Sequence, residues 1–157
     1  MNRKHSLNLL KLACVLTALM GVALFFFVAP AVVMDYASHR EPRFWIDLIY
    51  IWIVGALSFA ALGQAWKICV EIGRDNTFSE VNARGLVRIS RLMGTACALM
   101  AVGLAVLLFG RGQPEPVLEG LTALGALIAL VLALFASAMA QLIRAGAALK
   151  DENDLTI

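Results

Sequence analysis

The cysteines and histidines are the residues of this chain whose chemistry suits catalysis, redox exchange or metal binding. Cys14, Cys69 and Cys97 lack the spacing of a metal site, and an odd number of cysteines does not indicate a disulfide framework. Two interpretations stay open: a redox or metal site shared by all three at one membrane face, or three small apolar filling residues. His5 and His39 are expected on opposite sides of a membrane, so they cannot act together.

Sequence motifs for catalysis are absent from the chain. There is no histidine cluster, no glycine-rich phosphate loop and no nucleophile with a base in reach. We therefore predict no enzymatic activity, no catalytic residues and no cofactor or metal. A proton-coupled exporter is also disfavoured, because the long apolar segments contain no Asp, Glu, Lys, Arg or His, the residues that mark proton and ion paths in membranes.

Four long apolar segments dominate the chain. Of its 157 residues, 61% are hydrophobic and 15% are charged, and the mean hydropathy is +0.83. A soluble domain of this size needs far more polar surface. A transmembrane helix needs roughly 20 apolar residues, and uncharged windows of that order lie at 12–34, 48–66, 92–110 and 120–143. We predict an all-α integral membrane protein, a single domain (1–157) with four transmembrane helices in a bundle.

Basic residues predict how the bundle is oriented, because Lys and Arg accumulate in segments that stay in the cytoplasm. The N-terminal segment, the loop 67–91 and the tail 144–157 together contain ten Lys and Arg residues, whereas the two opposite loops contain three. Both termini and the loop 67–91 are therefore predicted to be cytoplasmic. Since the basic residues gather at one membrane face, we expect contact with the lipid bilayer and no direct binding of nucleic acid.

The loop 67–91 has the densest run of polar residues. Thr77-Phe78-Ser79-Glu80 fits a capping box, so a cytoplasmic extension of the third helix is predicted to begin near Phe78. On its helical wheel one stripe is apolar, formed by Val81, Gly85, Ile89, Leu92 and Met93. The adjoining stripe is basic and suits anionic lipid headgroups. The alternative is a docking surface for a cytoplasmic partner, and the candidate contacts for either use are Phe78, Asn82, Arg84, Arg88 and Arg91.

The C-terminal tail is acidic and ends in apolar residues. Its acidic residues follow the last helix at the end where the macrodipole disfavours anions, so that helix is predicted to fray near Lys150. Three interpretations stay open: a disordered end, a strand of Leu155-Thr156-Ile157 added to a partner's sheet, or a segment that folds back on the arginines of the basic stripe. The candidate contacts in the tail are Glu152, Asn153, Asp154 and Leu155.

Small residues in the fourth span predict close helix packing, because they let two backbones approach. They recur every four residues, at Gly125, Ala129, Ala133 and Ser137. A facing groove on the second span is predicted from Gly55, Phe59 and Gly63. Packing within one bundle is the favoured use of the small residues, and homodimerisation is the alternative.

Two motifs resemble those of a known family. The loop 67–91 contains Asn76-Thr77-Phe78-Ser79 followed by Asn82, Leu86 and Arg88, and the chain ends in Glu152-Asn153-Asp154-Leu155-Thr156-Ile157. With the four-span layout, these motifs resemble the small bacterial membrane proteins grouped as domain-of-unknown-function family 2975, over nearly the whole chain. The resemblance implies a bacterial cytoplasmic (inner) membrane and no established activity or ligand. It also implies a cytoplasmic partner, a small helix-turn-helix regulator encoded nearby.

Two functions are compatible with these features. The first is a regulatory or sensory membrane protein that engages a cytoplasmic partner through residues 77–91 and the tail, where the distinctive polar residues gather. The alternative is a small transporter or resistance component that moves or excludes an apolar compound. The sequence alone does not identify a ligand or a signal.

Overall fold

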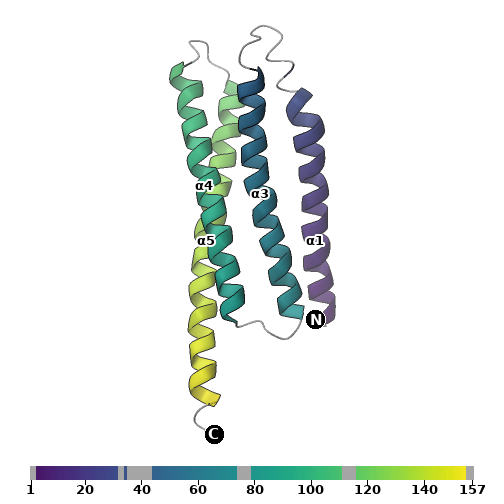
Figure 1. The fold of residues 1–157 in the computed structure, drawn as a ribbon, viewed down its shortest axis with the longest axis vertical. Helices are drawn as coiled ribbons and strands as arrows, with labels where there is room; N and C mark the ends of the chain where they lie inside the picture. Colours follow the sequence, from purple (N-terminus) through teal and green to yellow (C-terminus); the bar gives the residue numbers. More distant parts are fainter. Residues whose placement is uncertain (1–2, 32–33, 35–43, 74–78, 111–115, 155–157) are drawn as a thin grey trace.

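The computed structural model describes residues 3–31, 34, 44–73, 79–110 and 116–154. Helix α1 (Arg3–Ala23) continues into a short π-helical segment, η1 (Leu24–Val28), and is followed by α3 (Phe44–Gly73), α4 (Glu80–Gly110) and α5 (Pro116–Asp154). The helices run alternately up and down, and each lies beside the next along the chain (Figure 1). The described chain is thus an up-and-down helical bundle.

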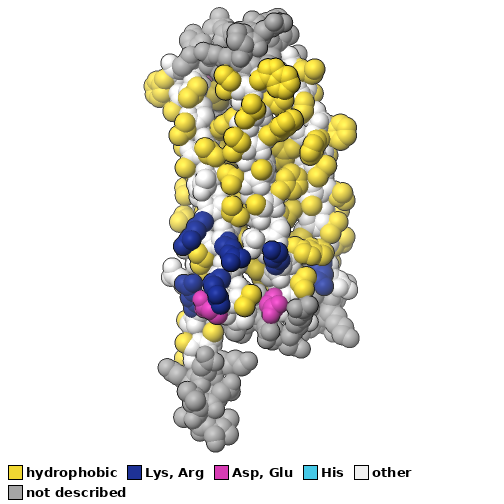
Figure 2. Space-filling view, viewed as in Figure 1, with side chains coloured by type: hydrophobic (Ala, Val, Ile, Leu, Met, Phe, Trp, Pro, Cys, Tyr) yellow, Lys and Arg dark blue, Asp and Glu magenta, His cyan; other side chains and the backbone are white. Residues whose placement is uncertain are grey.

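The helices are long and apolar enough to cross a membrane, in four spans: Asn8–Ala31, Trp45–Gly73, Glu80–Phe109 and Pro116–Leu149. At most 22% of each span's apolar window is buried inside the bundle, so most apolar side chains point outward, as the face in Figure 2 shows. Such a surface is stable against lipid tails and unstable against water. The predicted all-α membrane fold with four spanning helices is confirmed.

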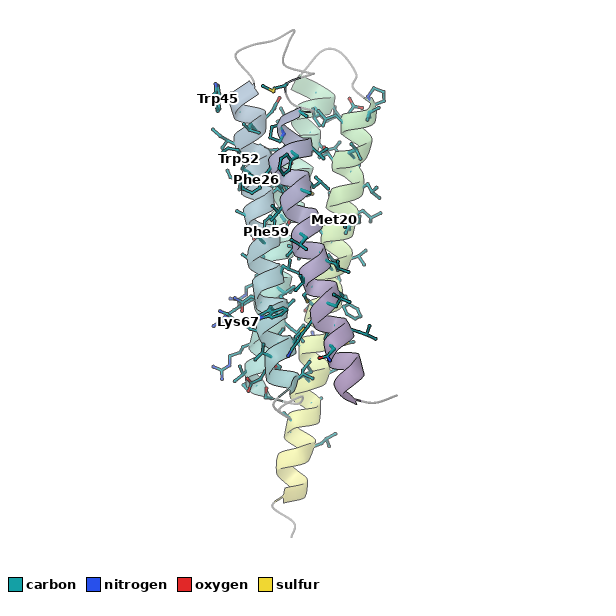
Figure 3. The ribbon with its side chains drawn as sticks, turned by 90° about the vertical axis from the view of Figure 1, so that its right-hand side faces the viewer. Met20, Phe26, Trp45, Trp52, Phe59 and Lys67 are labelled. Carbon is teal, nitrogen blue, oxygen red and sulfur yellow. The ribbon has the colours of Figure 1, made fainter. Side chains whose placement is uncertain are left out.

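Aromatic side chains mark the two ends of α3. Trp45 and Trp52 are exposed and lie toward one end of the bundle, whereas Lys67 lies toward the other (Figure 3). Trp66, next to Lys67, is also exposed. Tryptophan favours the membrane–water interface because its ring is apolar and its N–H is polar. These positions agree with a span whose hydrocarbon segment lies between the two tryptophan levels.

Small residues of α4 and α5 build the core. Ala133 of α5 joins Ala61, Met93 and Ala96 in one buried cluster. Along the predicted small-residue stripe, Ala129 and Ala133 are buried, Ser137 is half-buried, and a Cβ added at Gly125 would lie 3.2 Å from the sulfur of Met100. The stripe therefore packs against α4 within the bundle. The most extensive helix contact is accordingly that between α4 and α5.

The glycine face of α3 packs on α1 and on η1, which continues it. A Cβ added at Gly55 would lie 2.7 Å from the Phe25 ring, and Gly21 faces the ring of Phe59. The rings of Phe25 and Phe59 lie 5.9 Å apart. The prediction that Gly55 and Phe59 form a groove for the fourth span is therefore wrong. Its physical reason is the short up-and-down connectivity, which places α3 between α1 and α4.

Helix α5 does not fray near Lys150. It continues to Asp154 and projects straight past the other three helices (Figure 1), so the predictions of fraying and of a tail folded back on the arginines are both wrong. Residues 145–149 are Ala, Gly, Ala, Ala and Leu. Alanine and leucine favour helix, and residues that extend a helix already formed bear no nucleation cost. The helix therefore continues despite Gly146 and the unfavourable dipole interaction of the acidic residues.

Candidate functional sites at the basic end of the bundle

The basic side chains that the structure describes gather at one end of the bundle. Helices α1 and α4 begin at this end, and α3 and α5 reach it from the opposite end. Every Lys and Arg side chain that the structure describes belongs to it, and several form the blue band in the lower part of Figure 2. We call it the basic end, and its basic residues are Lys11, Lys67, Arg84, Arg88, Arg91 and Arg144. The structure thus brings the N-terminal helix, the arginines of α4 and the α5 tail to one side of the bundle.

Ser79 caps the start of α4. Its Oγ accepts a hydrogen bond from the backbone N–H of Asn82 at 3.3 Å, and its carbonyl accepts one from Ala83 at 3.1 Å. Such a cap stabilises a helix by about 1 kcal/mol. The prediction that Thr77 is the cap and that the helix begins near Phe78 is therefore wrong by two residues. Thr77 and Phe78 themselves lie outside the described residues.

In the first turn of α4, Asn82 faces the interior of the bundle and Val81 faces outward. Asn82 is 1% exposed, whereas Val81 is 59% exposed, so the predicted apolar stripe is wrong at Val81. The same face of the helix as Asn82 packs closely on α3 at Gly85, where an added Cβ would lie 3.1 Å from the Ile68 side chain. Asn82 is not accessible to a headgroup or a partner in this arrangement, which argues against its predicted contact role.

The arginines of α4 remain on the surface. Arg84, Arg88 and Arg91 are all exposed. Glu80 connects two helices, since its Oε1 lies 3.8 Å from Nε of Arg84 and 3.7 Å from Nε of Arg144 in α5. These side chains are about half exposed, so each pair contributes at most about 1 kcal/mol. Glu80 thus joins Arg84 of its own helix to Arg144 of α5, and Arg88 and Arg91 are exposed further along α4.

Helix α5 extends beyond this layer. Arg144 lies level with Glu80, the first residue of α4, and α5 runs ten residues further to Asp154. At about 1.5 Å per residue, the extension is about 15 Å long. Glu152, Asn153 and Asp154 lie on it, and Leu155 lies outside the described residues. The candidate contacts of the tail and those of α4 are at the same end, but the tail contacts project beyond the arginines.

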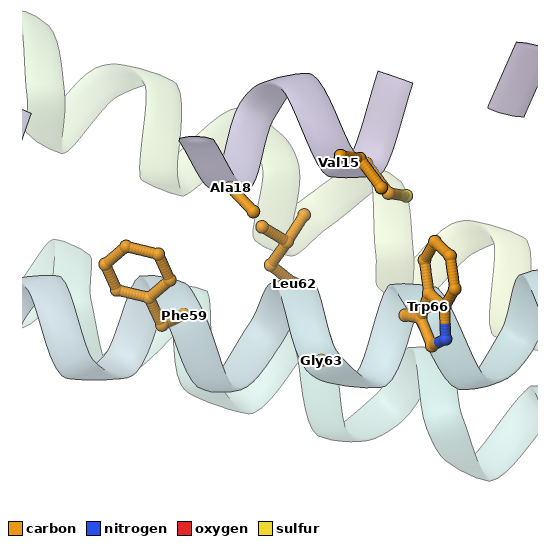
Figure 4. Close-up of a pocket in the computed structure, with 7 residues that line it drawn as sticks. Val15, Ala18, Phe59, Leu62, Gly63 and Trp66 are labelled. Carbon is orange, nitrogen blue, oxygen red and sulfur yellow. The ribbon is translucent and has the colours of Figure 1, made fainter. Parts of the chain in front are cut away.

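A groove between α1 and α3 was not predicted from the sequence. It has a volume of about 240 Å³. Val15 and Ala18 come from α1, and the side chains of Phe59, Leu62 and Trp66 point toward them from α3 (Figure 4). Cys14 and Gly63 complete the lining, so the groove is apolar except for a thiol and an indole N–H. Such a site suits a small apolar molecule or a lipid tail.

Two of the three cysteines meet beside this groove. Sγ of Cys14 lies 4.0 Å from Sγ of Cys69, where Cys14 borders the groove and Cys69 is 3% exposed. Cys97 lies on α4, 12 residues beyond Gly85, which contacts Ile68 beside Cys69; it is therefore about 18 Å further along the bundle by helix rise. A site shared by all three cysteines is therefore wrong. A sequence signal for the pair is the position of each cysteine near a lysine at the basic end. Cys14 follows Lys11 by about one helical turn, and Cys69 follows Lys67 by two residues.

A metal centre is not visible in the part of the chain that the structure describes. No group of three or more His, Cys, Asp or Glu side chains comes together there. The features at the basic end that could bind or react are therefore its surface charges, the projecting end of α5 and the thiol pair.

Comparisons with known proteins agree with this picture of a membrane protein. The model of a family of proteins of unknown function, DUF2975, matches residues 33–157. A relative from Bacillus subtilis (strain 168), described as the uncharacterized membrane protein YoaS, is 29% identical over 165 residues, and the alignment covers 100% of both chains. No solved structure matches the chain. Neither description states an enzymatic activity. Because the family model covers most of the chain and all of α3, α4 and α5, the protein belongs to the DUF2975 family of multi-pass membrane proteins.

Proposed function

We propose that the protein is a regulatory or sensory protein of the bacterial inner membrane, with the basic end in the cytoplasm. In this proposal a cytoplasmic partner binds the start of α4 and the extension of α5. The gathering of the described Lys and Arg side chains at one end supports the orientation. The proposal that a partner binds here rests on one observation: α5 extends about 15 Å past the first residue of α4.

Membrane crossing does not require this extension. A span needs roughly 20 residues, and α5 has 39. Leu149, the last residue of the apolar segment Pro116–Leu149, lies on the extension past Glu80 and is 67% exposed. A projecting helix with an apolar side chain gains stability when another surface covers it, because propensity alone gives marginal helices in water. A partner that covers the extension accounts for both its length and its apolar residue.

The charges on the two elements suggest the chemistry of that partner. Three acidic residues, Asp151, Glu152 and Asp154, belong to the extension, whereas Arg88 and Arg91 are exposed on α4. A helix-turn-helix regulator, the partner implied by the family resemblance, has a basic face that binds DNA. We propose that the acidic extension binds this face, so that the regulator is held at the membrane and away from DNA.

Co-purification tests this proposal. The full chain and a chain ending at Lys150 are each produced with the helix-turn-helix regulator of the neighbouring gene and purified in detergent. The full chain is expected to retain the regulator and the shortened chain to lose it. The paired variant Arg88→Ala/Arg91→Ala is expected to weaken retention, and Arg88→Lys/Arg91→Lys to preserve it. Equal retention by the full and shortened chains contradicts the proposal, and failure of the alanine pair to insert assigns those arginines to topology.

The groove favours a second candidate function, a small transporter or resistance component for an apolar compound. Its lining and its volume of about 240 Å³ suit such a compound. This function predicts that cells expressing the chain accumulate less of the compound. It also predicts that the effect survives removal of the tail and is lost when Gly63→Leu fills the groove. Unchanged accumulation in cells lacking the protein contradicts it.

A further inference from the structure

The thiol pair and the groove form one site. We infer that Cys14 and Cys69 are oxidised to a disulfide by a membrane-soluble quinone that binds in the groove between α1 and α3. The oxidation itself does not depend on the proposed function, although the redox state of the pair would be a signal that a regulatory protein could sense.

The two sulfur atoms lie close to van der Waals contact. The two Sγ atoms are 4.0 Å apart, about 2 Å more than the bond of about 2.05 Å that a disulfide requires. Changes between side-chain rotamers move a sulfur by this amount without moving the backbone. The two cysteines come from different helices and are 55 residues apart in the chain, so their contact results from the packing of α1 on α3.

The groove suits the head of a quinone. Its volume of about 240 Å³ is slightly below the range of about 300–1,000 Å³ for drug-sized ligands, so it accommodates a single ring rather than a large molecule. Phe59 and Trp66 supply aromatic surfaces on either side of Leu62 (Figure 4). The groove is open at the bundle surface, which allows the apolar tail of a quinone to remain among lipid chains. A polar oxidant gains nothing from this lining.

Burial assigns a separate role to each cysteine. Cys14 lines the groove and meets the quinone, whereas Cys69 is 3% exposed and lies behind it. In the first step Sγ of Cys14 adds to a ring carbon, and the thiol proton ends on a quinone oxygen. In the second step Sγ of Cys69 loses its proton and attacks Sγ of Cys14. The sulfur–carbon bond breaks, and its electron pair stays with the ring. The second proton completes the hydroquinone, so two thiols and one quinone give one disulfide and one hydroquinone.

The experiment uses the full chain with Cys97→Ser, which leaves only the pair, reduced and reconstituted in lipid nanodiscs without oxygen. A benzoquinone with a decyl tail is added, and hydrogen peroxide serves as the polar oxidant in a parallel reaction. Mass spectrometry of the Cys14 and Cys69 peptides follows the disulfide, and absorbance follows the hydroquinone. The inference predicts one hydroquinone per disulfide. Single variants Cys14→Ser and Cys69→Ser are expected to form no intramolecular disulfide.

A groove-filling variant separates a quinone site from a merely accessible thiol pair. A Cβ added at Gly63 meets no atom within 4 Å, so Gly63→Leu places its side chain in the groove without a backbone clash. It is expected to slow oxidation by the quinone about tenfold, the factor that corresponds to 1.4 kcal/mol of lost binding. Its oxidation by peroxide is expected to stay unchanged, which also shows that the two helices remain packed. Gly120→Leu, at another open glycine, is the matched control.

Three outcomes overturn the inference. The first is no disulfide in the wild-type pair after quinone treatment. The second is a stable quinone adduct on Cys14 that Cys69 does not resolve. The third is equal quinone oxidation of the Gly63→Leu and Gly120→Leu variants, which removes the groove from the reaction. None of these outcomes depends on regulator binding, so the inference and the proposed function fail separately.

Discussion

Replacing Gly103 with alanine tests the contact between α3 and α4. A Cβ added at Gly103 would lie 2.7 Å from Cζ of Tyr50 and would also crowd its hydroxyl oxygen. That hydroxyl donates a hydrogen bond to the carbonyl of Leu99 at 3.3 Å. The tyrosine ring must therefore move, and its hydrogen bond must weaken or break.

The magnitude follows from three terms. Overpacking costs about 1–3 kcal/mol, and the lost hydrogen bond costs about 1 kcal/mol. The higher helix propensity of alanine returns about 1 kcal/mol. Gly103→Ala is therefore expected to destabilise the bundle by about 1–3 kcal/mol. Gly94→Ala on the same helix meets no atom within 4 Å, so this control is expected to be neutral or stabilising.

A double-mutant cycle assigns the cost to the tyrosine. Tyr50→Phe removes the crowded oxygen, so Gly103→Ala is expected to cost about 1 kcal/mol less in that background. Stability is measured by titrating dodecyl sulfate into detergent micelles and following helical circular dichroism. Two results would refute the packing of Tyr50 between Leu99 and Gly103. One is that the Gly103→Ala protein is as stable as the Gly94→Ala protein. The other is that the effects of Gly103→Ala and Tyr50→Phe simply add.

Three further substitutions test other contacts. Ser79→Ala is expected to destabilise the first turn of α4 by about 1 kcal/mol, seen as faster amide hydrogen exchange at Asn82 and Ala83, and Thr77→Ala is expected to leave that exchange unchanged. Glu80→Gln removes both ion pairs of Glu80 and is expected to cost at most about 1 kcal/mol, a loss that high salt should abolish; a larger, salt-independent loss contradicts the surface pairing. Gly55→Val forces the Phe25 ring away and is expected to slow peroxide cross-linking of Cys14 to Cys69, whereas an unchanged rate contradicts the packing of α1 on α3.

The number of spans and the grouping of charges were predictable because both depend on composition along the chain. A run without charges needs no knowledge of its neighbours to be identified as a span. The helical path of the tail was less predictable. The acidic residues after Lys150 indicate a helix end when they are considered alone. The alanine-rich segment before them continues a helix that is already nucleated and packed, so no nucleation cost arises.

Helix neighbours and the cap of α4 were not predictable from local pattern. Gly55 and Phe59 suit any helix that offers a complementary shape. The packed bundle shows that Phe25 of η1, which continues α1, packs against them. Thr77 and Ser79 are both competent caps. Local pattern does not rank the two, and the structure shows Ser79 in the role, with its Oγ accepting from the N–H of Asn82.

The last turns of α3 connect the two candidate sites. Cys69 contacts Cys14 of α1, and its neighbour Ile68 packs on Gly85 of α4. Successive helical residues point about 100° apart, so one turn of α3 contacts both helices. A disulfide at Cys69 constrains the rotation of this turn, and with it the support of the α4 start. If the thiol pair is an input to regulator binding, oxidised and reduced full-length protein should retain the regulator to different extents in the co-purification assay. Cys69→Ser should abolish that difference, whereas equal retention in both redox states shows that the thiol site does not act on the partner surface.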